Sequence, residues 1–442
     1  MTEAARREQV SGDSDGAAAA TAPPPGSAKV YRGGTHRSRR PEETLARVLP
    51  FAGQMGITRL ANVTGLDSIG IPVFMACRPL SRSIAVSQGK GLTVDEAKVS
   101  AFMESAETFH AERIAKPLRM LSFNELAGSQ RVIGVSGLPR SRLGDFHPEQ
   151  PILWIEAARL DPGHCTAGDR GEPLWVPLEL VSTNFTLPQP PGSYVFPADT
   201  NGLASGNTFE EAALHAVCEL IERDALSLWR LGGDAVRAAS KMDAGTVNSP
   251  AARSLLDHYA QAGLSVGLWD VTSDVGVPVF CCAVAEPSDH SVEAELGAGC
   301  HPDREVALLR ALTEAAQSRT TRIAGSRDDY VPESYDSAAK LARNRTARLW
   351  LADPPQRGYG DVPSLGGADI AGDLSAVLSC LEAVGVEEVA AVDLTKPEIG
   401  IPVVRAVASG LEGAYQGEGS DYRTGRRARA RGLSLPSERA GA

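Results

Sequence analysis

Three segments of the chain share one pattern, in which a glycine-containing turn leads into a helix with apolar residues on one face. In residues 200–229, Leu214, Val217 and Ile221 recur three or four positions apart, which is helical spacing. Two other segments repeat this arrangement of turn, apolar face and acidic side chains. The pattern therefore predicts three related helices.

Glutamates recur on these helices in a fixed register. Glu219 and Glu222 lie one turn apart, and Glu211 lies about 80° around the helix from Glu219. A shift of 115 residues, from Gly91 to Gly206, superposes the first helix on the second, and a shift of 210 residues superposes it on the third. The aligned acidic positions are Glu96 with Glu211, Glu104 with Glu219 and Glu314, and Glu107 with Glu222 and Gln317. Random surface charge would not keep this register, so we infer a shared function.

The strands repeat as well. Residues 62–73, 270–279 and 393–403 each contain a polar turn followed by a β-branched run that includes a proline, which is typical of a strand that begins after a turn. Internal duplication explains both sets of repeats. The fold class predicted is α/β (mixed α+β), with pseudo-symmetric units of strand, glycine turn and acidic helix whose helices meet near one centre.

The repeats extend over most of the 442 residues and favour one large domain at residues 29–410. Residues 1–28 are rich in Ala, Pro, Gly and Ser, which predicts a disordered leader. Residues 411–442 form a basic, partly disordered tail, whose arginine run would be solvated or would fold back over an anionic ligand.

Composition excludes several classes of function. The net charge of -11 argues against nucleic acid and anionic membranes as partners. The sequence contains no run of 18 apolar residues, so no membrane span is predicted. The seven cysteines contain no CxxC pair, so neither a disulfide framework nor a zinc site is indicated. Without a signal peptide, a cytoplasmic location is expected.

Helices that bring several carboxylates to one centre need a counter-charge, because close like charges repel and burial adds to the cost. Oxygen ligands select a hard cation such as Mg²⁺, which commonly bridges carboxylates to phosphates. Arg37, Lys90 and Arg319 are candidates for contacts with those phosphates. The leading inference from the residues is an Mg²⁺–nucleotide site.

Two alternatives remain open at this point. In the first, the acids form a metal-free core of ion pairs with Arg223, Arg310 and Arg319. In the second, a zinc hydrolase uses histidines, although these lack the HExxH spacing. The histidines concerned are His110, His215 and His301.

The segment TNGLASGNTFEEAALHAVCELIERDA, together with GKGLTVDEAKVSAFMESAE and ALTEAAQSR, resembles the YcaO family over residues 29–410. This resemblance implies a YcaO-type domain that uses ATP and Mg²⁺ to phosphorylate a backbone amide oxygen of a ribosomally made peptide. A nucleophile then adds at the carbonyl carbon and phosphate leaves.

The resemblance also implies the residues of the site. The first family element matches Ser100, Glu104 and Glu107, and Gln317 matches the third, with Arg319 as its basic partner because Thr321 occupies the fourth place after Gln317. The second element matches Asn207, Glu211, Glu219 and Glu222. The residues that would bind ATP are Arg37, Thr44, Lys90, Ser100, Asn207, Gln317 and Arg319. The five glutamates would hold Mg²⁺. The chain departs from the family at Thr108, where many members have arginine.

Other stretches of the chain resemble one particular group within the YcaO family. The stretches YRGGTHR, PEETLARV and MESAETFHAE are similar to YcaO proteins encoded beside TfuA, which are associated with thioamides. This implies a peptide substrate, a TfuA-like partner, a sulfur donor and, as a further possibility, a homodimer. The PxPxP ending of many azoline-forming members is missing from SLPSERAGA, and no region is left over for a leader-binding domain.

The function expected is therefore ATP-dependent thioamide formation on a peptide or protein backbone. The alternatives are an azoline-forming cyclodehydratase, in which a side chain of the substrate is the nucleophile, and a non-catalytic nucleotide-binding scaffold of a modification complex. No nucleophile of the protein itself is required, because the incoming group belongs to a second substrate.

Overall fold

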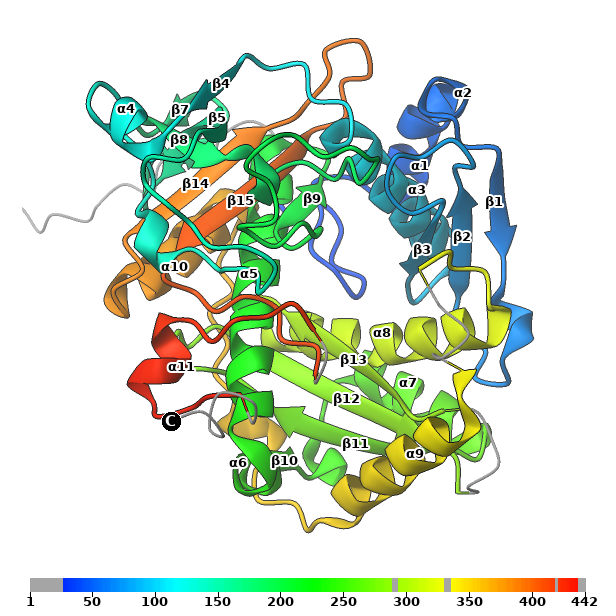
Figure 1. Ribbon diagram of the computed structural model, residues 1–442. Helices are drawn as coiled ribbons and strands as arrows, with labels where there is room; N and C mark the ends of the chain where they lie inside the picture. The colour runs from blue at the N-terminus through cyan, green and yellow to red at the C-terminus, as the bar shows by residue number, and fades with distance from the viewer. Residues whose placement is uncertain (1–26, 288–292, 330–334, 418–419, 436–442) are drawn as a thin grey trace, which may run out of the picture.

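Three antiparallel units are arranged around a common centre, with one long helix of each on the inner side (Figure 1). The computed structural model describes residues 27–287, 293–329, 335–417 and 420–435. The predicted leader lies outside these residues except at its end, where the carbonyl of Ser27 accepts a hydrogen bond from the amide of Ile370 (2.8 Å).

The first unit is a three-stranded sheet followed by the first acidic helix. Strand β2 pairs on one edge with β1 and on the other with β3, both antiparallel. Helix α3 carries Thr93 as its N-cap, whose side chain accepts from the amide of Glu96. The elements are α1 (Pro41–Val48), α2 (Ala52–Met55), β1 (Arg59–Asn62), β2 (Val73–Cys77), β3 (Val86–Lys90) and α3 (Val94–Ala111).

The second unit repeats this order later in the chain. Strands β11, β12 and β13 pair antiparallel as β1, β2 and β3 do, and the short β10 extends the sheet beyond β11. The elements are α6 (Gly233–Ala239), β10 (Lys241–Met242), α7 (Pro250–Gln261), β11 (Ser265–Asp270), β12 (Val279–Ala285), β13 (Glu295–Cys300), α8 (Arg304–Ala324) and α9 (Ser337–Ala352).

The third unit is assembled from two distant segments. Strand β15 pairs with β14 on one side and with β9 on the other, although β9 and the helix that follows it precede β14 by more than 150 residues. Its third strand and acidic helix are thus supplied by the middle of the chain. The elements are β9 (Leu203–Ser205), α5 (Phe209–Leu231), α10 (Ile370–Ala383), β14 (Glu388–Asp393) and β15 (Val403–Ser409).

An excursion between the first and third units widens the third sheet. Strand β5 pairs with β14, and both β4 and β8 pair with β5. The elements are β4 (Leu118–Leu121), α4 (Phe123–Ala127), β5 (Ile152–Leu160), β6 (Cys165–Thr166), β7 (Asp169–Arg170) and β8 (Pro173–Pro177).

Glycines let two of the three inner helices, α3 and α8, lie directly on their sheets, whereas the equivalent position of the third unit is Ala204. A Cβ added to Gly89 would lie 2.3 Å from the carbonyl oxygen of Ala97, and one added to Gly299 would lie 2.1 Å from that of Ala307. Gly299 and Ala307 are the residues that the shift of 210 aligns with Gly89 and Ala97. The same close contact at equivalent positions supports the internal duplication inferred from the sequence.

One arginine of the C-terminal segment, Arg427, departs from the expectation, whereas Arg426, Arg429 and Arg431 are exposed. Within the described residues 411–417 and 420–435, Tyr415 and Tyr422 are buried in a cluster with Leu228 of α5. The guanidinium of Arg427, in α11 (Arg426–Ala430), forms an ion pair with buried Asp224 (2.9 Å). Arg427 is therefore neither solvated nor directed at an external anion, because a carboxylate of α5 already neutralises it.

Among the described residues, no helix has the length and the apolar character needed to cross a bilayer.

Candidate functional site

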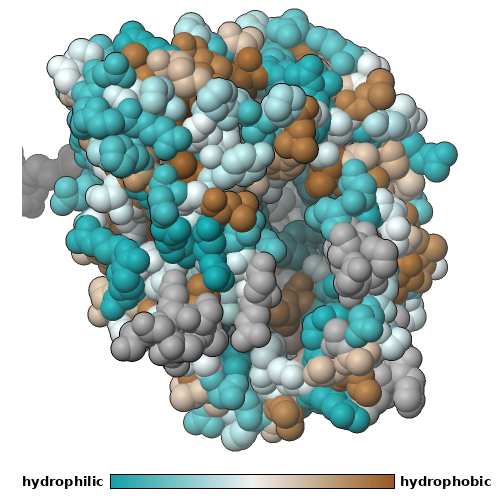
Figure 2. Space-filling model, viewed as in Figure 1, coloured by the Kyte–Doolittle hydropathy of each residue, from teal (hydrophilic) through white to brown (hydrophobic). Residues whose placement is uncertain are grey.

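A cavity of about 470 Å³ lies where the inner helices α3, α5 and α8 converge. Figure 2, drawn from the same side as Figure 1, shows the molecule hollowed near the centre of the view. Its size is typical of sites for small molecules and cofactors. Of the residues expected to bind ATP or Mg²⁺, those that line it are Arg37, Thr44, Lys90, Ser100, Glu104, Glu107, Asn207, Glu211, Glu219, Glu222 and Gln317.

Side chains from the three helices form two layers in this cavity. The first layer consists of Glu104, Glu219 and Glu314, and one helical turn further on lies the second, which consists of Glu107, Glu222 and Gln317. Each layer takes one residue from each unit, at the positions that the repeat aligns. The sequence identified Glu314 as the equivalent of Glu104, but Glu314 was not included in the metal-binding set.

Burial shifts the protonation of these acids. Desolvation raises the pKa of Glu104 to about 7 despite the opposing charge of Lys90. It raises the pKa of Glu107 to about 8, although Ser205 donates to this carboxylate from both its amide (2.8 Å) and its hydroxyl (2.7 Å). The pKa values of Glu219 and Glu222 are also raised by burial. The carboxylates therefore lack enough positive charge to hold all of them ionised.

The cations within the cavity neutralise only part of this charge. Lys90 lies 2.5 Å from Glu314, and Arg223 lies 3.4 Å from Glu219 and 3.5 Å from Glu222. Among the described residues, neither Glu104 nor Glu107 has an ion-pair partner. The metal-free core of ion pairs thus accounts for three of the five glutamates in the two layers, Glu219, Glu222 and Glu314. An all-oxygen set of unpaired carboxylates fits Mg²⁺.

Glu211 lies at the same cavity but differs from the other acids. Its carboxylate accepts from Arg37 (3.1 Å), from the amide and hydroxyl of Ser38 (3.0 and 2.9 Å) and from the side chain of Asn207 (3.2 Å). The hydroxyl of Thr44 in turn donates to Asn207 (2.9 Å). Three residues predicted to bind ATP are therefore joined to Glu211 in one hydrogen-bonded network, which uses both of its oxygens.

Arg319 does not line the cavity, contrary to the prediction. Its guanidinium is buried between Asp67 (3.0 Å) and Glu286 (2.5 Å). The reason is helical geometry, because a residue two positions after Gln317 points about 200° away from it. Thr321, about one turn after Gln317, faces the cavity instead.

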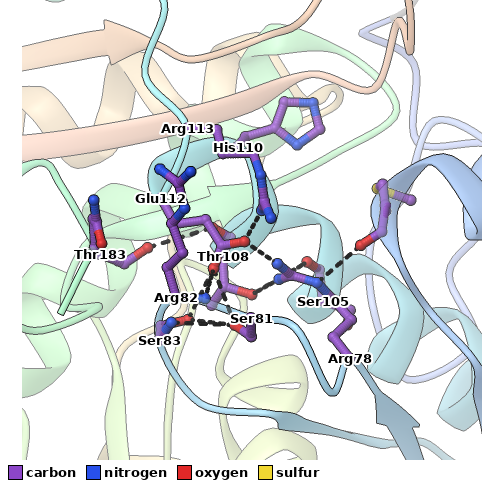
Figure 3. A network of polar contacts seen from close by, with 12 residues as sticks. Arg78, Ser81, Arg82, Ser83, Ser105, Thr108, His110, Glu112, Arg113 and Thr183 are labelled. Carbon is purple, nitrogen blue, oxygen red and sulfur yellow. Dashed lines mark hydrogen bonds and ion pairs between the residues drawn. The ribbon is translucent and has the colours of Figure 1, made fainter. Parts of the chain in front are cut away.

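Figure 3 shows the polar contacts around Thr108, the position at which the chain departs from the family pattern. The guanidinium of Arg78, which follows β2, donates to the Thr108 hydroxyl (2.7 Å) and to the carbonyls of Ser105 (3.0 Å) and Met55 (3.1 Å). It also pairs with buried Glu112, at the end of α3. These contacts fix the last turn of the helix that carries Glu104 and Glu107.

The three histidines of the zinc alternative do not converge. The Nδ1 of His110 faces the Ala106 carbonyl (2.6 Å), and His215 contacts Arg310. His301 lies near His36 and Asp373. Its Nδ1 accepts from a backbone amide, that of Asp303 (2.9 Å), so the proton of the neutral ring is on Nε2 and leaves no lone pair for a metal.

Known protein families and curated proteins include matches to this chain. Residues 88–412 match the family model described as YcaO cyclodehydratase, ATP- and Mg²⁺-binding. The chain is 34% identical over 393 residues to a Rhizobium leguminosarum bv. trifolii protein from the tfuA 3′ region, covering 86% of this chain and 90% of the relative. It is 36% identical over 386 residues to an uncharacterised protein of Methanothermobacter thermautotrophicus, covering 84% and 94% respectively.

Solved structures agree in fold. The structure of YcaO from Methanopyrus kandleri bound with AMPPCP and Mg²⁺ matches with a TM-score of 0.67 at 24% identity, covering 87% of this chain and 95% of the other. A heterocyclase in complex with substrate and cofactor matches with a TM-score of 0.71 at 22% identity, covering 92% of this chain. The match spans only 57% of the heterocyclase chain.

The family match and the curated relatives confirm the resemblance to the YcaO family that the three acidic helices indicated. A mixed α/β fold of three related units encloses a cavity lined by acids, and the cofactors of the family are ATP and Mg²⁺. The chain belongs to the YcaO family.

Proposed function

We propose that this protein uses Mg²⁺–ATP to activate a peptide backbone amide by O-phosphorylation and that sulfide then converts the amide to a thioamide. The observation that carries the proposal is the pair of carboxylate layers in which Glu104 and Glu107 have no ion-pair partner among the described residues. Bound Mg²⁺–ATP would supply both the missing positive charge and the phosphoryl group.

The residues of the chain then divide by role. Glu104, Glu107, Glu219 and Glu222 would hold Mg²⁺, and the repeat adds Glu314 as a further oxygen donor at this layer. Around them, the side chains that line the cavity and would contact the nucleotide are Arg37, Thr44, Lys90, Ser100, Asn207 and Gln317. Glu211 already accepts hydrogen bonds from Arg37, Ser38 and Asn207. We therefore propose that Glu211 orients the Arg37 side chain and does not bind Mg²⁺ directly.

The reaction needs positioning and charge neutralisation more than a reactive side chain. The amide oxygen attacks the γ-phosphorus and ADP leaves. Sulfide adds to the activated carbon, and the C–O bond breaks as phosphate departs with the former amide oxygen. No cysteine lines the described cavity, so the sulfur would come from an external donor.

The relative from the tfuA 3′ region supports the proposal of a TfuA-like partner. The thioamide is favoured over the azoline on this ground, and the azoline remains the second candidate because the matched family is described as a cyclodehydratase. The two are separated by the mass of the product. Exchange of oxygen for sulfur that depends on sulfide supports the thioamide, whereas loss of water without sulfide supports the azoline.

The enzymatic proposal is tested by release of ADP and phosphate with Mg²⁺, peptide and partner present. Glu219→Gln and Glu222→Gln should abolish turnover in a folded protein, because each removes a carboxylate from the cavity. Glu172→Gln, which alters an exposed ion pair with Arg131, is the matched control and should remain active. Wild-type turnover in both cavity variants, or no turnover by the wild type, would contradict the proposal.

A further inference from the structure

The layer one turn before the carboxylates contains two residues that have no assigned role in the site. Ser100, His215 and Arg310 occupy equivalent positions in the three helices, each four residues before the glutamate of the first layer, and all three line the cavity. The guanidinium of Arg310 donates from Nη2 to Nε2 of His215. Two of the three units therefore contribute a linked pair of nitrogen donors.

The contact with Arg310 determines the tautomer of His215. Because Nε2 accepts a hydrogen bond, the proton of the neutral ring is on Nδ1. Burial lowers the pKa of His215 well below its usual value, and the charges of Arg310, Arg37 and Lys90 lower it further. The ring is therefore neutral, and its Nδ1–H has no hydrogen-bond acceptor among the described residues. It is a donor at the cavity wall and not a base or a metal ligand.

Arg310 has no acidic partner among the described residues. It is half-buried, and its contact is with a neutral ring; no carboxylate of the described chain lies within ion-pair distance of it. A half-buried guanidinium without a counter-ion is unfavourable. Among the described residues, the cavity thus has one unpaired carboxylate in each glutamate layer, Glu104 and Glu107, and an unpaired guanidinium one turn before the first layer. A ligand that carries a metal cation and an anionic group side by side would satisfy both.

We infer that Arg310 and His215 form an anion subsite that binds phosphate oxygens of a metal-bound polyphosphate. Arg310 would take the role that the sequence assigned to Arg319, and the Nδ1–H of His215 would add a neutral donor. This inference rests on the proposed function and adds two residues to it. Guanidinium–phosphate contacts are strong and often bidentate, so Arg310 is the larger contributor.

The test is calorimetric titration of inorganic pyrophosphate, in the presence of Mg²⁺, into the wild type and variants. Arg310→Gln should weaken binding by about tenfold or more, which is the loss of one charged contact. His215→Asn places an amide N–H near the position of Nδ1 and should bind almost as the wild type does. His215→Gln, which places its amide N–H near Nε2 instead, should bind several-fold more weakly. Arg131→Gln, at the surface, serves as the control.

The outcomes separate this inference from the proposed function. If the wild type binds Mg²⁺–ATP but Arg310→Gln and His215→Gln bind pyrophosphate as the wild type does, the subsite is wrong and the proposed function stands. If the wild type binds neither ligand, both are wrong. Equal losses in His215→Asn and His215→Gln would show that the ring only fills space. Circular dichroism and melting temperature check each fold, and Arg310→Lys replaces Arg310→Gln if the latter fails to fold.

Discussion

At the scale of single residues, the site is defined by carboxylates whose charge the protein does not balance. Glu104 and Glu107 are half-buried and have no ion-pair partner in the described chain, whereas Glu211, also acidic and on the same cavity, is fully engaged by Arg37, Ser38 and Asn207. Residue type alone does not distinguish the two cases. The partner of each carboxylate does.

This imbalance predicts a pH dependence. In the free protein, burial holds the pKa of Glu104 near 7 and that of Glu107 near 8, both above their unfolded values. Their contribution to stability is therefore fully present below about pH 4.3 and is lost as the pH rises through 7 and 8. Because Mg²⁺ binds the ionised forms, its affinity should rise over the same range.

The measurement is the Mg²⁺-induced rise in melting temperature as a function of pH. The rise should be small near pH 6 and should increase up to about pH 8.5. Glu104→Gln/Glu107→Gln should remove most of this dependence. A Mg²⁺ effect in the wild type that is constant between pH 6 and 8.5 would contradict the assignment of these two residues.

Removal of Glu112 should destabilise the fold rather than change a ligand contact. Glu112→Gln leaves the Arg78 guanidinium buried without its counter-charge, and loss of one partner of a buried pair costs about 3 kcal/mol. Urea denaturation measures the free energy of unfolding. Glu172→Gln, in an exposed pair, should cost less than about 1 kcal/mol, and equal effects of the two substitutions would count against the network in Figure 3.

At the scale of elements, two of the three inner helices, α3 and α8, each pack closely on their sheet at a glycine. The equivalent contacts of Gly89 with Ala97 and of Gly299 with Ala307 place the glutamate layers at one level. The sequence predicted these helices well, because periodic apolar residues and glycine turns are local signals. It misplaced Arg319, because the resemblance aligned a residue type without testing which face of the helix it occupies.

Gly299→Ala tests this contact. The added methyl group would overlap the carbonyl of Ala307, so α8 must shift and carry Glu314 with it. We expect a loss of about 2 kcal/mol or more in the free energy of unfolding together with weaker Mg²⁺ binding. Gly360→Ala, where no atom lies within 4 Å of the new methyl group, should change neither quantity, and an unchanged Gly299→Ala would show that the close contact is dispensable.

At the scale of the whole molecule, three units of related structure each bring one helix to a shared cavity. The sequence predicted this convergence, but it did not show that the third unit combines β9 and α5 with β14 and β15, because strand pairing between distant segments leaves no periodic signal. Nor did the sequence show that Arg78, which follows β2, would donate a hydrogen bond to Thr108 in α3. Both relations arise from packing in three dimensions.

The most direct test of the central claim is a crystal structure with Mn²⁺ in place of Mg²⁺ and a non-hydrolysable ATP analogue, with the metal located by anomalous scattering. The account predicts metal peaks about 2.1 Å from carboxylate oxygens of the two layers, including those of Glu104 or Glu107, with the triphosphate beside them. Nucleotide bound elsewhere, or in this cavity with no metal on these carboxylates, would contradict it.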